Sequence, residues 1–470
     1  MEPVRGPKAA RENATPLPVE RLIRPFQDFA RFGAAGGIVL MLAAIAAFVI
    51  AQTDLYESYH EFFSHVISIG LDDWKIDVPL GDYTKPLTFE LFINDALMAI
   101  FFLFVGLEIK RELLVGELSS PRKAALPIAA AIGGMVVPAA IYAALNWGNT
   151  DAIKGWGVPM ATDIAFALGV LMLLGKRIPT SLKVFLTSLA IVDDLGALLV
   201  IAVFYTDHLN VEALRNASII VAFLAGLNLL GVKKHAPYLL LGLPLWYFVL
   251  ESGVHATIAG ILLALAIPAR QRIDPDAFLE SNRNALDVFE EAKSKAPDVR
   301  RNPDLIAAAR TIELNCEHIE PPLHRLEHKL AGLCAFLIIP VFAFANAGVH
   351  LSAESNLASK VTLGVIFGLV IGKPLGILIA CFIAIKIRCG ELPTGVTWHH
   401  IHGASWLAGI GFTMSLFIAN LAFKDSQAHL DEAKIGILAA SLLAGLVGLT
   451  VLLLTTKAPP PPEDDDHPES

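Results

Sequence analysis

The sequence has few charged residues for its length. Asp, Glu, Lys and Arg make up 17% of the 470 residues, whereas 55% are apolar and the mean hydropathy is +0.59. A soluble domain carries about 25% charged residues, so this composition excludes a soluble globular protein and predicts a polytopic membrane protein. The formal net charge of −9 arises largely in the loops and the acidic C-terminal end, and we expect no nucleic-acid partner.

Cysteine is scarce as well, and it is not paired in the sequence. Cys316, Cys334, Cys381 and Cys389 form no CxxC motif. Two of them lie in apolar runs, where cysteine is usually a small buried side chain. The pattern argues against a disulfide framework and against a cysteine-bound metal, and no cofactor is expected.

Long apolar runs, in contrast, fill most of the chain. Twelve are long enough, or nearly long enough, to cross a bilayer, and the seventh and eighth are short and close together. They lie near 33–51, 88–109, 124–146, 156–175, 180–206, 213–231, 235–250, 253–268, 330–349, 359–385, 403–423 and 435–455. The predicted fold class is therefore an all-α polytopic membrane protein with about twelve transmembrane helices.

Lysine and arginine are distributed unevenly between alternate loops. One set of loops, together with both ends of the chain, holds 28 of the 36 basic residues, the opposite set holds 7, and Lys373 lies inside a span. The positive-inside rule therefore predicts that both termini are cytoplasmic. Residues 1–32, a cytoplasmic arm in this topology, do not have the layout of a signal peptide.

The loops add three features to the predicted transmembrane domain, 33–455. The outward loop 52–87 has alternating apolar residues ahead of Gly81-Asp82, which predicts a small hairpin. The inward insert 269–329 is charged and is predicted to form a solvated helical hairpin. The proline-rich acidic tail 456–470 is predicted to be disordered.

Three carboxylates lie deep in two adjacent apolar runs. Asp163 is thirteen positions before the basic turn between the runs, and Asp193 and Asp194 begin thirteen positions after it. At 1.5 Å per residue all three lie ~20 Å from that turn, near the middle of a ~30 Å hydrocarbon core. Because a carboxylate there costs ~3 kcal/mol or more, these residues are predicted to line a site for an ion or a proton.

Lys373 is predicted to lie at the same depth, thirteen positions before the basic loop at 386. A buried ammonium group needs a partner, and the candidates at that depth are Asp163, Asp193, Asp194 and Asp95. Asp193 and Asp194 are adjacent, so on a helix they point about 100° apart. One can face a cavity while the other faces the lysine, and hard carboxylate oxygens suit Na⁺ or Li⁺.

Helix breakers accompany these charges. Glycine and proline residues precede Thr162-Asp163, and the string GIGFTMS lies within the eleventh run. Irregular backbone at membrane depth is tolerated only where it lines a cavity or is buried in protein. We therefore predict two broken helices, near 155–176 and 403–423, whose partial end charges an aspartate and a lysine can compensate.

Several strings resemble one family. They are FINDALMAIFFLFVGLEIKREL, GVPMATDIAFALGVL, LAIVDDLGAL, GVHATIAG, RLEH, FAFANAG, GKPLGI and GIGFTMSLFIANLAF. In this order, and spread from about residue 88 to 423, they are similar to the NhaA-type Na⁺/H⁺ antiporters of bacterial inner membranes. The resemblance implies inverted-topology repeats and two broken helices that cross in mid-membrane.

The resemblance also implies roles for the residues at depth. Asp194 binds the cation and carries a proton, and Asp193 is the partner of Lys373. Thr162 and Asp163 support the site and balance the helix ends, with Na⁺ bound at Asp194 and Asp163.

Further residues receive roles only from the resemblance. Asp95 matches the family's second-span aspartate, and the pH-sensing set comprises Glu108, Arg111, Glu112, Glu327 and His255. From the sequence alone, the first three of that set equally fit an ordinary charge cluster at the cytoplasmic mouth, and His255 fits a packed, hydrogen-bonded histidine. The resemblance also implies a homodimer held partly through the outward hairpin. The insert 269–324 exceeds the family's core and directly precedes Glu327.

Together these observations predict a secondary transporter and not an enzyme. It would exchange cytoplasmic Na⁺ or Li⁺ for external protons across a bacterial inner membrane by alternating access, electrogenically and with activation by rising pH. One alternative, a sodium-coupled solute symporter, would need a solute pocket, and no cluster of polar or aromatic residues indicates one. An intramembrane aspartyl protease would need a GxGD string, which is absent, and a passive channel would need a carbonyl or charged ring.

Overall fold

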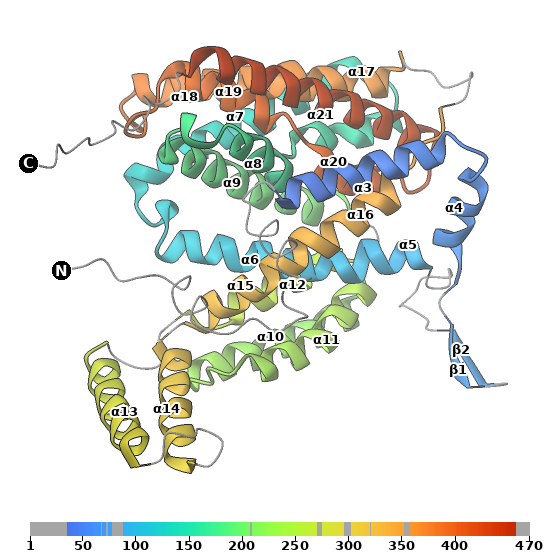
Figure 1. The fold of residues 1–470 in the computed structure, drawn as a ribbon. Helices are drawn as coiled ribbons and strands as arrows, with labels where there is room; N and C mark the ends of the chain where they lie inside the picture. Colours follow the sequence, from blue (N-terminus) through green and yellow to red (C-terminus); the bar gives the residue numbers. More distant parts are fainter. Residues whose placement is uncertain are drawn as a thin grey trace, which may run out of the picture.

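Long apolar helices, lying side by side, make up most of the molecule (Figure 1). The computed structural model describes residues 35–66, 68–71, 74–77, 88–206, 209–269, 275–295, 302–319, 321–351 and 358–456. The predicted arm 1–32 and nearly all of the tail 456–470 lie outside these residues.

The first half of the chain supplies eight of the predicted runs. Its helices are α3 (Ala35–Ala51), α4 (Tyr56–Ser64), α5 (Phe89–Leu91), η1 (Phe92–Leu97), α6 (Met98–Leu114), η2 (Glu117–Ser119), α7 (Pro121–Leu145), η3 (Ala152–Met160), α8 (Ile164–Leu173), η4 (Gly175–Arg177), α9 (Thr180–Phe204), α10 (Val211–Leu229), α11 (His235–Glu251) and α12 (Thr257–Ala266).

The second half supplies the insert and four more runs. Its helices are α13 (Pro275–Lys295), α14 (Pro303–Ile319), α15 (Pro322–Leu333), η5 (Cys334–Ile338), α16 (Ile339–Asn346), α17 (Lys360–Phe367), η6 (Gly368–Gly372), α18 (Lys373–Lys386), α19 (Trp398–Ala408), α20 (Phe412–Ala422) and α21 (Gln427–Thr455).

Every predicted run coincides with a helix or with a series of helices. Among the described residues, seven helices are long and apolar enough to cross a membrane, and ten if each of three bent pairs counts as one span. The eighth run differs most from its prediction, because α12 has only ten residues. It is shortened by a turn after α11 in which Gly253 has φ +81°, a backbone conformation that glycine adopts at no steric cost. The count of twelve spans stays a prediction.

The bent pairs include both breaks that the sequence predicted. η3 and α8 meet at 40°, and α19 and α20 meet at 42°. The third pair, α3 and α4, bends by 115°, so that α4 lies across the end of the bundle in Figure 1. This third bend was not predicted from the sequence.

Two glycines allow α7 and α18 to cross at very close range. A Cβ atom on Gly133 would lie 2.2 Å from the carbonyl oxygen of Gly376, and a Cβ atom on Gly376 would lie 2.1 Å from that of Gly133. Small residues let helix backbones approach in this way in membranes. The crossing fixes α18, which begins at Lys373, against α7.

Three helical spans are interrupted by π-helical turns. η1 contains Asp95, η5 interrupts the helix between α15 and α16, and η6 ends immediately before Lys373. Such turns carry one extra residue and are frequent at functional sites. Two of the three therefore adjoin charged residues that the sequence had singled out.

The helices α10, α11 and α12 form a separate layer that packs on α6. Their buried side chains, including Leu224, Tyr238 and Leu245, make a second hydrophobic cluster with Leu103 and Leu107 of α6. In Figure 1 this layer lies below α6, whereas the two bent pairs at 152–173 and 398–422 lie above it. The two broken helices, with Asp163 between η3 and α8, belong to the upper part.

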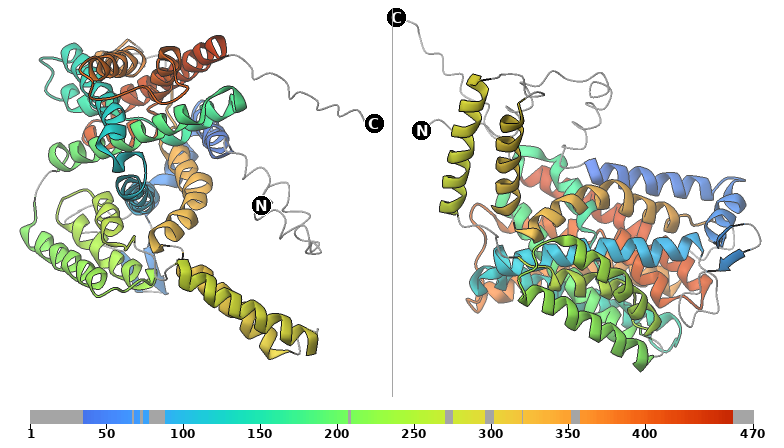
Figure 2. Two further views of the ribbon diagram at one scale, coloured as in Figure 1. Left: turned by 90° about the vertical axis from the view of Figure 1, so that its left-hand side faces the viewer. Right: turned by 90° about the horizontal axis from the view of Figure 1, so that it is seen from below.

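The insert forms a helical hairpin, as predicted. α13 and α14 pack side by side and project from one end of the bundle (Figure 2). The helix that contains the ninth run begins at Pro322, before the predicted end of the insert at 329. Proline is favourable at the first helical position, and Glu327 consequently lies on this helix and not in the hairpin.

A β-hairpin projects from the opposite end of the bundle (Figure 1). β1 (Ser68–Leu71) pairs antiparallel with β2 (Trp74–Asp77), with Ser68 opposite Asp77. The hairpin was predicted, but its position differs, because the connection lies between Leu71 and Trp74. The predicted turn at Gly81-Asp82 lies outside the described residues.

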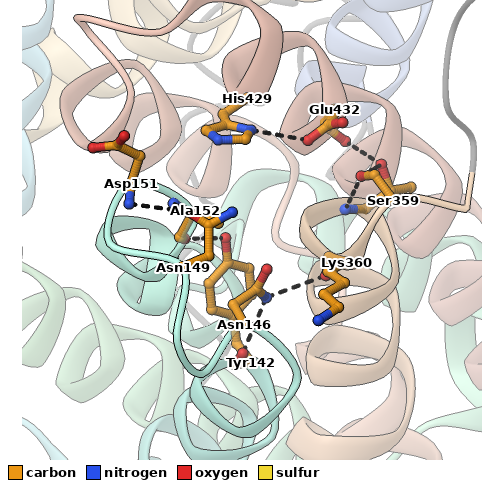
Figure 3. Close-up of polar contacts among 10 residues, drawn as sticks. Tyr142, Asn146, Asn149, Asp151, Ala152, Ser359, Lys360, His429 and Glu432 are labelled. Atoms are coloured by element: carbon orange, nitrogen blue, oxygen red, sulfur yellow. Dashed lines mark hydrogen bonds and ion pairs between the residues drawn. The ribbon is translucent and has the colours of Figure 1, made fainter.

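A polar network ties together the helix ends near this side of the bundle (Figure 3). The buried Tyr142 of α7 donates a hydrogen bond of 2.8 Å from its hydroxyl to the carbonyl of Ala152, at the start of η3. The amide of Asn146 donates to the carbonyl of Lys360, at the start of α17. Thr362 of α17 donates to the carbonyl of Glu432 in α21. The network therefore fixes the start of the first broken helix to three others.

We expect Tyr142→Phe to lower the free energy of unfolding by about 1–2 kcal/mol, because it leaves a buried carbonyl without its donor. The measurement is the thermal unfolding midpoint of the purified protein in detergent. Tyr247→Phe is the matched control, since Tyr247 is 39% exposed and its hydroxyl has no hydrogen bond among the described residues. Equal midpoints for the two variants would contradict the proposed contribution.

Candidate charge-compensated site at two helix breaks

The two broken helices meet where each of them is interrupted. Between η3 and α8 the chain is extended at Ala161 and Asp163, and the amide of Asp163 donates a 2.7 Å hydrogen bond to the carbonyl of Ile410, between α19 and α20. Pro159 contributes to the first break, since it has no N–H for a helical hydrogen bond. The hydroxyl of Ser415 then donates to the carbonyl of Val158, at 2.8 Å.

Asp163 caps the N-termini of both broken halves. One oxygen, Oδ1, accepts from the backbone N–H of Phe166 in α8 at 2.9 Å. The other, Oδ2, accepts from the backbone N–H and the hydroxyl of Thr413 in α20, at 3.0 and 2.6 Å. A helix N-terminus carries about half a positive charge, so a single carboxylate compensates two such ends. Thr413 was not among the predicted site residues.

Lys373 lies at the opposite end of the first break. Its ammonium group donates a hydrogen bond to the carbonyl of Met160, the last residue of η3, and lies 2.5 Å from Oδ2 of Asp193. Both side chains of the pair are completely buried. Of the four partners that depth allowed, the lysine therefore contacts Asp193, the one that the resemblance implied.

Thr162 joins this ion pair to the second broken helix. Its hydroxyl lies 2.7 Å from Oδ2 of Asp193 and 2.9 Å from the carbonyl oxygen of Ala408, the last residue of α19. A hydroxyl has a single proton to donate. With both oxygens as acceptors, it can therefore serve only one of them at a time.

Asp194 differs from the other two aspartates because it has no partner. It is 1% exposed, and among the described residues its carboxylate makes no hydrogen bond or ion pair. Oδ1 of the neighbouring Asp193 also lacks a hydrogen bond. An ionised carboxylate that is buried and unpaired is unstable, so an ionised Asp194 would need a positive charge beside it.

The predicted cytoplasmic cluster is also assembled. Arg111 of α6 lies 2.8 Å from Glu112, 2.8 Å from Glu327 of α15 and 3.9 Å from Glu108, between nitrogen and oxygen atoms. One guanidinium group thus joins three carboxylates from two helices. His255 does not belong to this group, although it was assigned to the same pH-sensing set.

His255 lies instead beside Asp95. The distance between Nε2 of His255 and Oδ1 of Asp95 is 3.7 Å, and Nδ1 of the histidine lies 3.0 Å from the hydroxyl of Thr257. The imidazole also packs edge-on against Phe417 of α20. The sequence had singled out Asp95 and His255 separately and gave no signal that they are neighbours.

The comparisons with known proteins identify the family of the chain. The sequence profile of the family described as "Na+/H+ antiporter 1" matches residues 27–452. The chain belongs to this family. The Na⁺/H⁺ antiporter NhaA of Oleidesulfovibrio alaskensis is 51% identical over 441 residues, which cover 93% of this chain and 96% of the relative.

Other NhaA proteins are similar over nearly the same length. The NhaA of Koribacter versatilis is 49% identical over 438 residues, covering 93% of this chain and 92% of the relative. An NhaA of Helicobacter pylori is 47% identical over 431 residues, covering 91% and 94%. The NhaA family consists of transporters and not of enzymes, which excludes the protease alternative.

We expect Lys373→Met to destabilise the protein by about 3–5 kcal/mol, because it leaves Asp193 as an uncompensated buried charge. In the double variant Lys373→Met/Asp193→Asn, most of this loss should be recovered, since neither charge remains. The thermal unfolding midpoint in detergent measures both effects. Lys360→Met, at an exposed lysine, is the control, and a double variant no more stable than the single one would contradict the pairing energy.

Proposed function

We propose that the protein exchanges cytoplasmic Na⁺ or Li⁺ for external protons by alternating access, with Asp194 as the group that the ions and protons share. Membership of the Na⁺/H⁺ antiporter family supports the exchange itself. The observation that carries the role of Asp194 is its burial without any hydrogen-bond or ion-pair partner among the described residues. The predicted contribution of Asp163 to Na⁺ binding stays a second part of this proposal.

Competition for one site would produce the exchange. A proton neutralises the Asp194 carboxylate, and Na⁺ or Li⁺ does so equally well through hard oxygen ligands. A site that is stable only when a proton or a cation is bound switches its access between the two sides of the membrane only in the bound state. Each switch therefore carries either a cation or a proton across. Asp163 and Lys373, with their contacts to the two breaks, would keep the irregular backbone intact in both states.

The exchange would also move net charge. Asp193 lies 2.5 Å from Lys373 and next to Asp194, so a cation bound at Asp194 changes the field at both neighbours. Release of a second proton from this group would make two protons exchange for one cation. The transport rate would then depend on the membrane potential.

The cytoplasmic cluster around Arg111 supports the proposed pH sensing. Glu108, Glu112 and Glu327 share one guanidinium group. Glu327 is the member from α15, so its protonation weakens the link between α6 and α15. We propose that this cluster keeps the exchanger inactive in acid and releases it as the pH rises. His255 and Asp95 lie near the starts of α12 and α6, away from the Arg111 cluster near the end of α6. We propose that this pair contributes to the same response.

We further propose twelve spans with inverted-topology repeats, in a bacterial inner membrane, with both termini and the α13–α14 hairpin in the cytoplasm. The distribution of 28 against 7 basic residues supports this orientation. The two broken helices support the repeats. In the predicted topology they cross the membrane in opposite directions, and they meet at their breaks.

A homodimer is proposed as the assembly. The hairpin of β1 and β2 is a sheet of only two strands, so its outer edges have backbone groups that a second copy can pair with. Its projection from the bundle in Figure 1 supports such a contact.

Asp194→Asn should abolish the collapse of a respiration-generated ΔpH by Na⁺ or Li⁺ in everted vesicles of an antiporter-deficient strain. The amide can neither release a proton nor neutralise a cation. Asp425→Asn, at an exposed acid, should retain the wild-type rate at equal protein amount. Exchange by the Asp194 variant above the vesicle background would refute the proposed role, and a wild type inactive with every cation would refute the antiport and favour a solute symporter.

A second experiment addresses proton number and pH activation. In proteoliposomes, the apparent KM for Na⁺ should rise more than about tenfold per unit of falling pH, because more than one proton competes with each cation. Clamping the membrane potential with valinomycin and K⁺ should accelerate the exchange. A tenfold dependence together with no effect of the clamp would indicate electroneutral exchange of one proton for one cation.

A further inference from the structure

A pocket with unpaired basic residues lies at the inner ends of α7, α9 and α18. Its volume is about 720 Å³, and its lining, here called the inner pocket, includes Arg122, Lys123, Ser181, Arg388 and Glu391. Lys123 is paired with Glu117, the other acid of the lining, at 3.3 Å. With three basic and two acidic residues, the inner pocket has a net charge of +1.

An apolar groove adjoins this pocket on the surface between α7 and α18. Its volume is about 420 Å³, and all of its lining residues are aliphatic residues or glycines except Cys389, which also lines the inner pocket. This α7–α18 groove extends along α7 from Ala125 to Val137. The twelve helical steps between these two residues span ~18 Å, close to the ~15 Å depth of one hydrocarbon leaflet.

Two arginines of the inner pocket occupy positions that are unfavourable for the free protein. Arg388 has φ 60° and is the only described residue other than glycine with a positive φ, a conformation that costs roughly 1 kcal/mol or more in a residue with a Cβ. Arg122 lies in the first turn of α7, which contains no acidic residue, next to the positive end of the helix dipole. Neither arginine has an ion-pair partner in the described part of the chain.

We infer that the inner pocket and the α7–α18 groove together bind one anionic phospholipid, with its phosphate at Arg122 and Arg388 and one acyl chain in the groove. A phosphodiester carries one negative charge and balances the net charge of the pocket. It also offsets the unfavourable helix-end position of Arg122. Basic pockets between membrane helices on the cytoplasmic side recognise such headgroups.

The bound lipid would adjoin the helices that hold the exchange site. The groove runs beside the crossing of Gly133 and Gly376, and Gly376 follows Lys373 by a single helical turn. An acyl chain there packs against both helices of that crossing. The lipid therefore stabilises the crossing of α7 with α18, the helix whose Lys373 pairs with Asp193 of α9.

Native mass spectrometry of the full-length protein tests the binding. After its release from detergent micelles, the protein should retain one more molecule of phosphatidylglycerol than of phosphatidylcholine. Arg388→Gly should weaken the retention of phosphatidylglycerol about fivefold, and Arg122→Gln should do the same, given the usual contribution of a basic residue near an anionic surface. Glycine suits the backbone of residue 388, so this variant should fold at least as well as the wild type.

Matched variants separate the site from general effects of charge and surface. Arg177→Gln removes an exposed arginine from the loop between α8 and α9, outside the inner pocket, and should leave retention unchanged. Ala129→Phe fills the groove and should abolish the extra lipid. Ile128→Phe, on the 39% exposed neighbouring residue outside the groove, should not.

Three outcomes would overturn the inference. They are equal retention of phosphatidylcholine, unchanged retention in the arginine variants, and binding of inorganic phosphate as strong as that of phosphatidylglycerol, which would indicate a site for a free anion. The inference rests on the membrane orientation given under the proposed function, but the assay measures no transport. If the wild-type protein retains the lipid but shows no antiport, only the exchange proposal is refuted. If it shows antiport but no preferential retention of phosphatidylglycerol, only the lipid site is refuted.

Discussion

The arrangement of this molecule depends on compensating the backbone charges at two interrupted helices. An interrupted helix has unpaired N–H and carbonyl groups at its ends, and in an apolar interior these groups need partners. Asp163 accepts from both N-terminal ends, and Lys373 donates to the C-terminal end at Met160. The hydroxyl of Thr162 can donate to the C-terminal end at Ala408 when it does not donate to Asp193. The breaks thus persist because two charged side chains and one hydroxyl replace the missing backbone hydrogen bonds.

This compensation explains why four charged side chains are buried close together in space at the two breaks. Three of them, Asp163, Asp193 and Lys373, have structural partners, whereas Asp194 has no hydrogen bond or ion pair among the described residues. In the proposed function, the residues that hold the backbone are therefore distinct from the residue that binds the ion. The close crossing of α7 and α18 contributes by fixing the lysine that donates to the end of η3 at the first break.

Much of this site could be predicted from the sequence because charge within an apolar run is conspicuous. Asp163, Asp193, Asp194 and Lys373 were recognised from depth alone, and glycine and proline indicated both breaks. Spacing left four partners open for the lysine, and only the resemblance to a known family selected Asp193. No local pattern predicted three features that depend on tertiary packing. They are the capping of Thr413 by Asp163, the contact of Asp95 with His255 and the bend after α3. The position of the β-hairpin was missed because apolar and polar residues continue to alternate beyond β2.

The π-helical turn before Lys373 has a consequence for the direction of that side chain. A π turn holds one more residue than an α turn, and each residue of an α-helix adds 100° of rotation. In η6 the extra residue therefore rotates all of α18 by about 100° relative to α17. If the same sequence continued as a regular α-helix, the ammonium group would point away from Asp193 by that angle. The angular phase of the lysine is thus set by five residues of backbone, Gly368–Gly372, and not by its own rotamer.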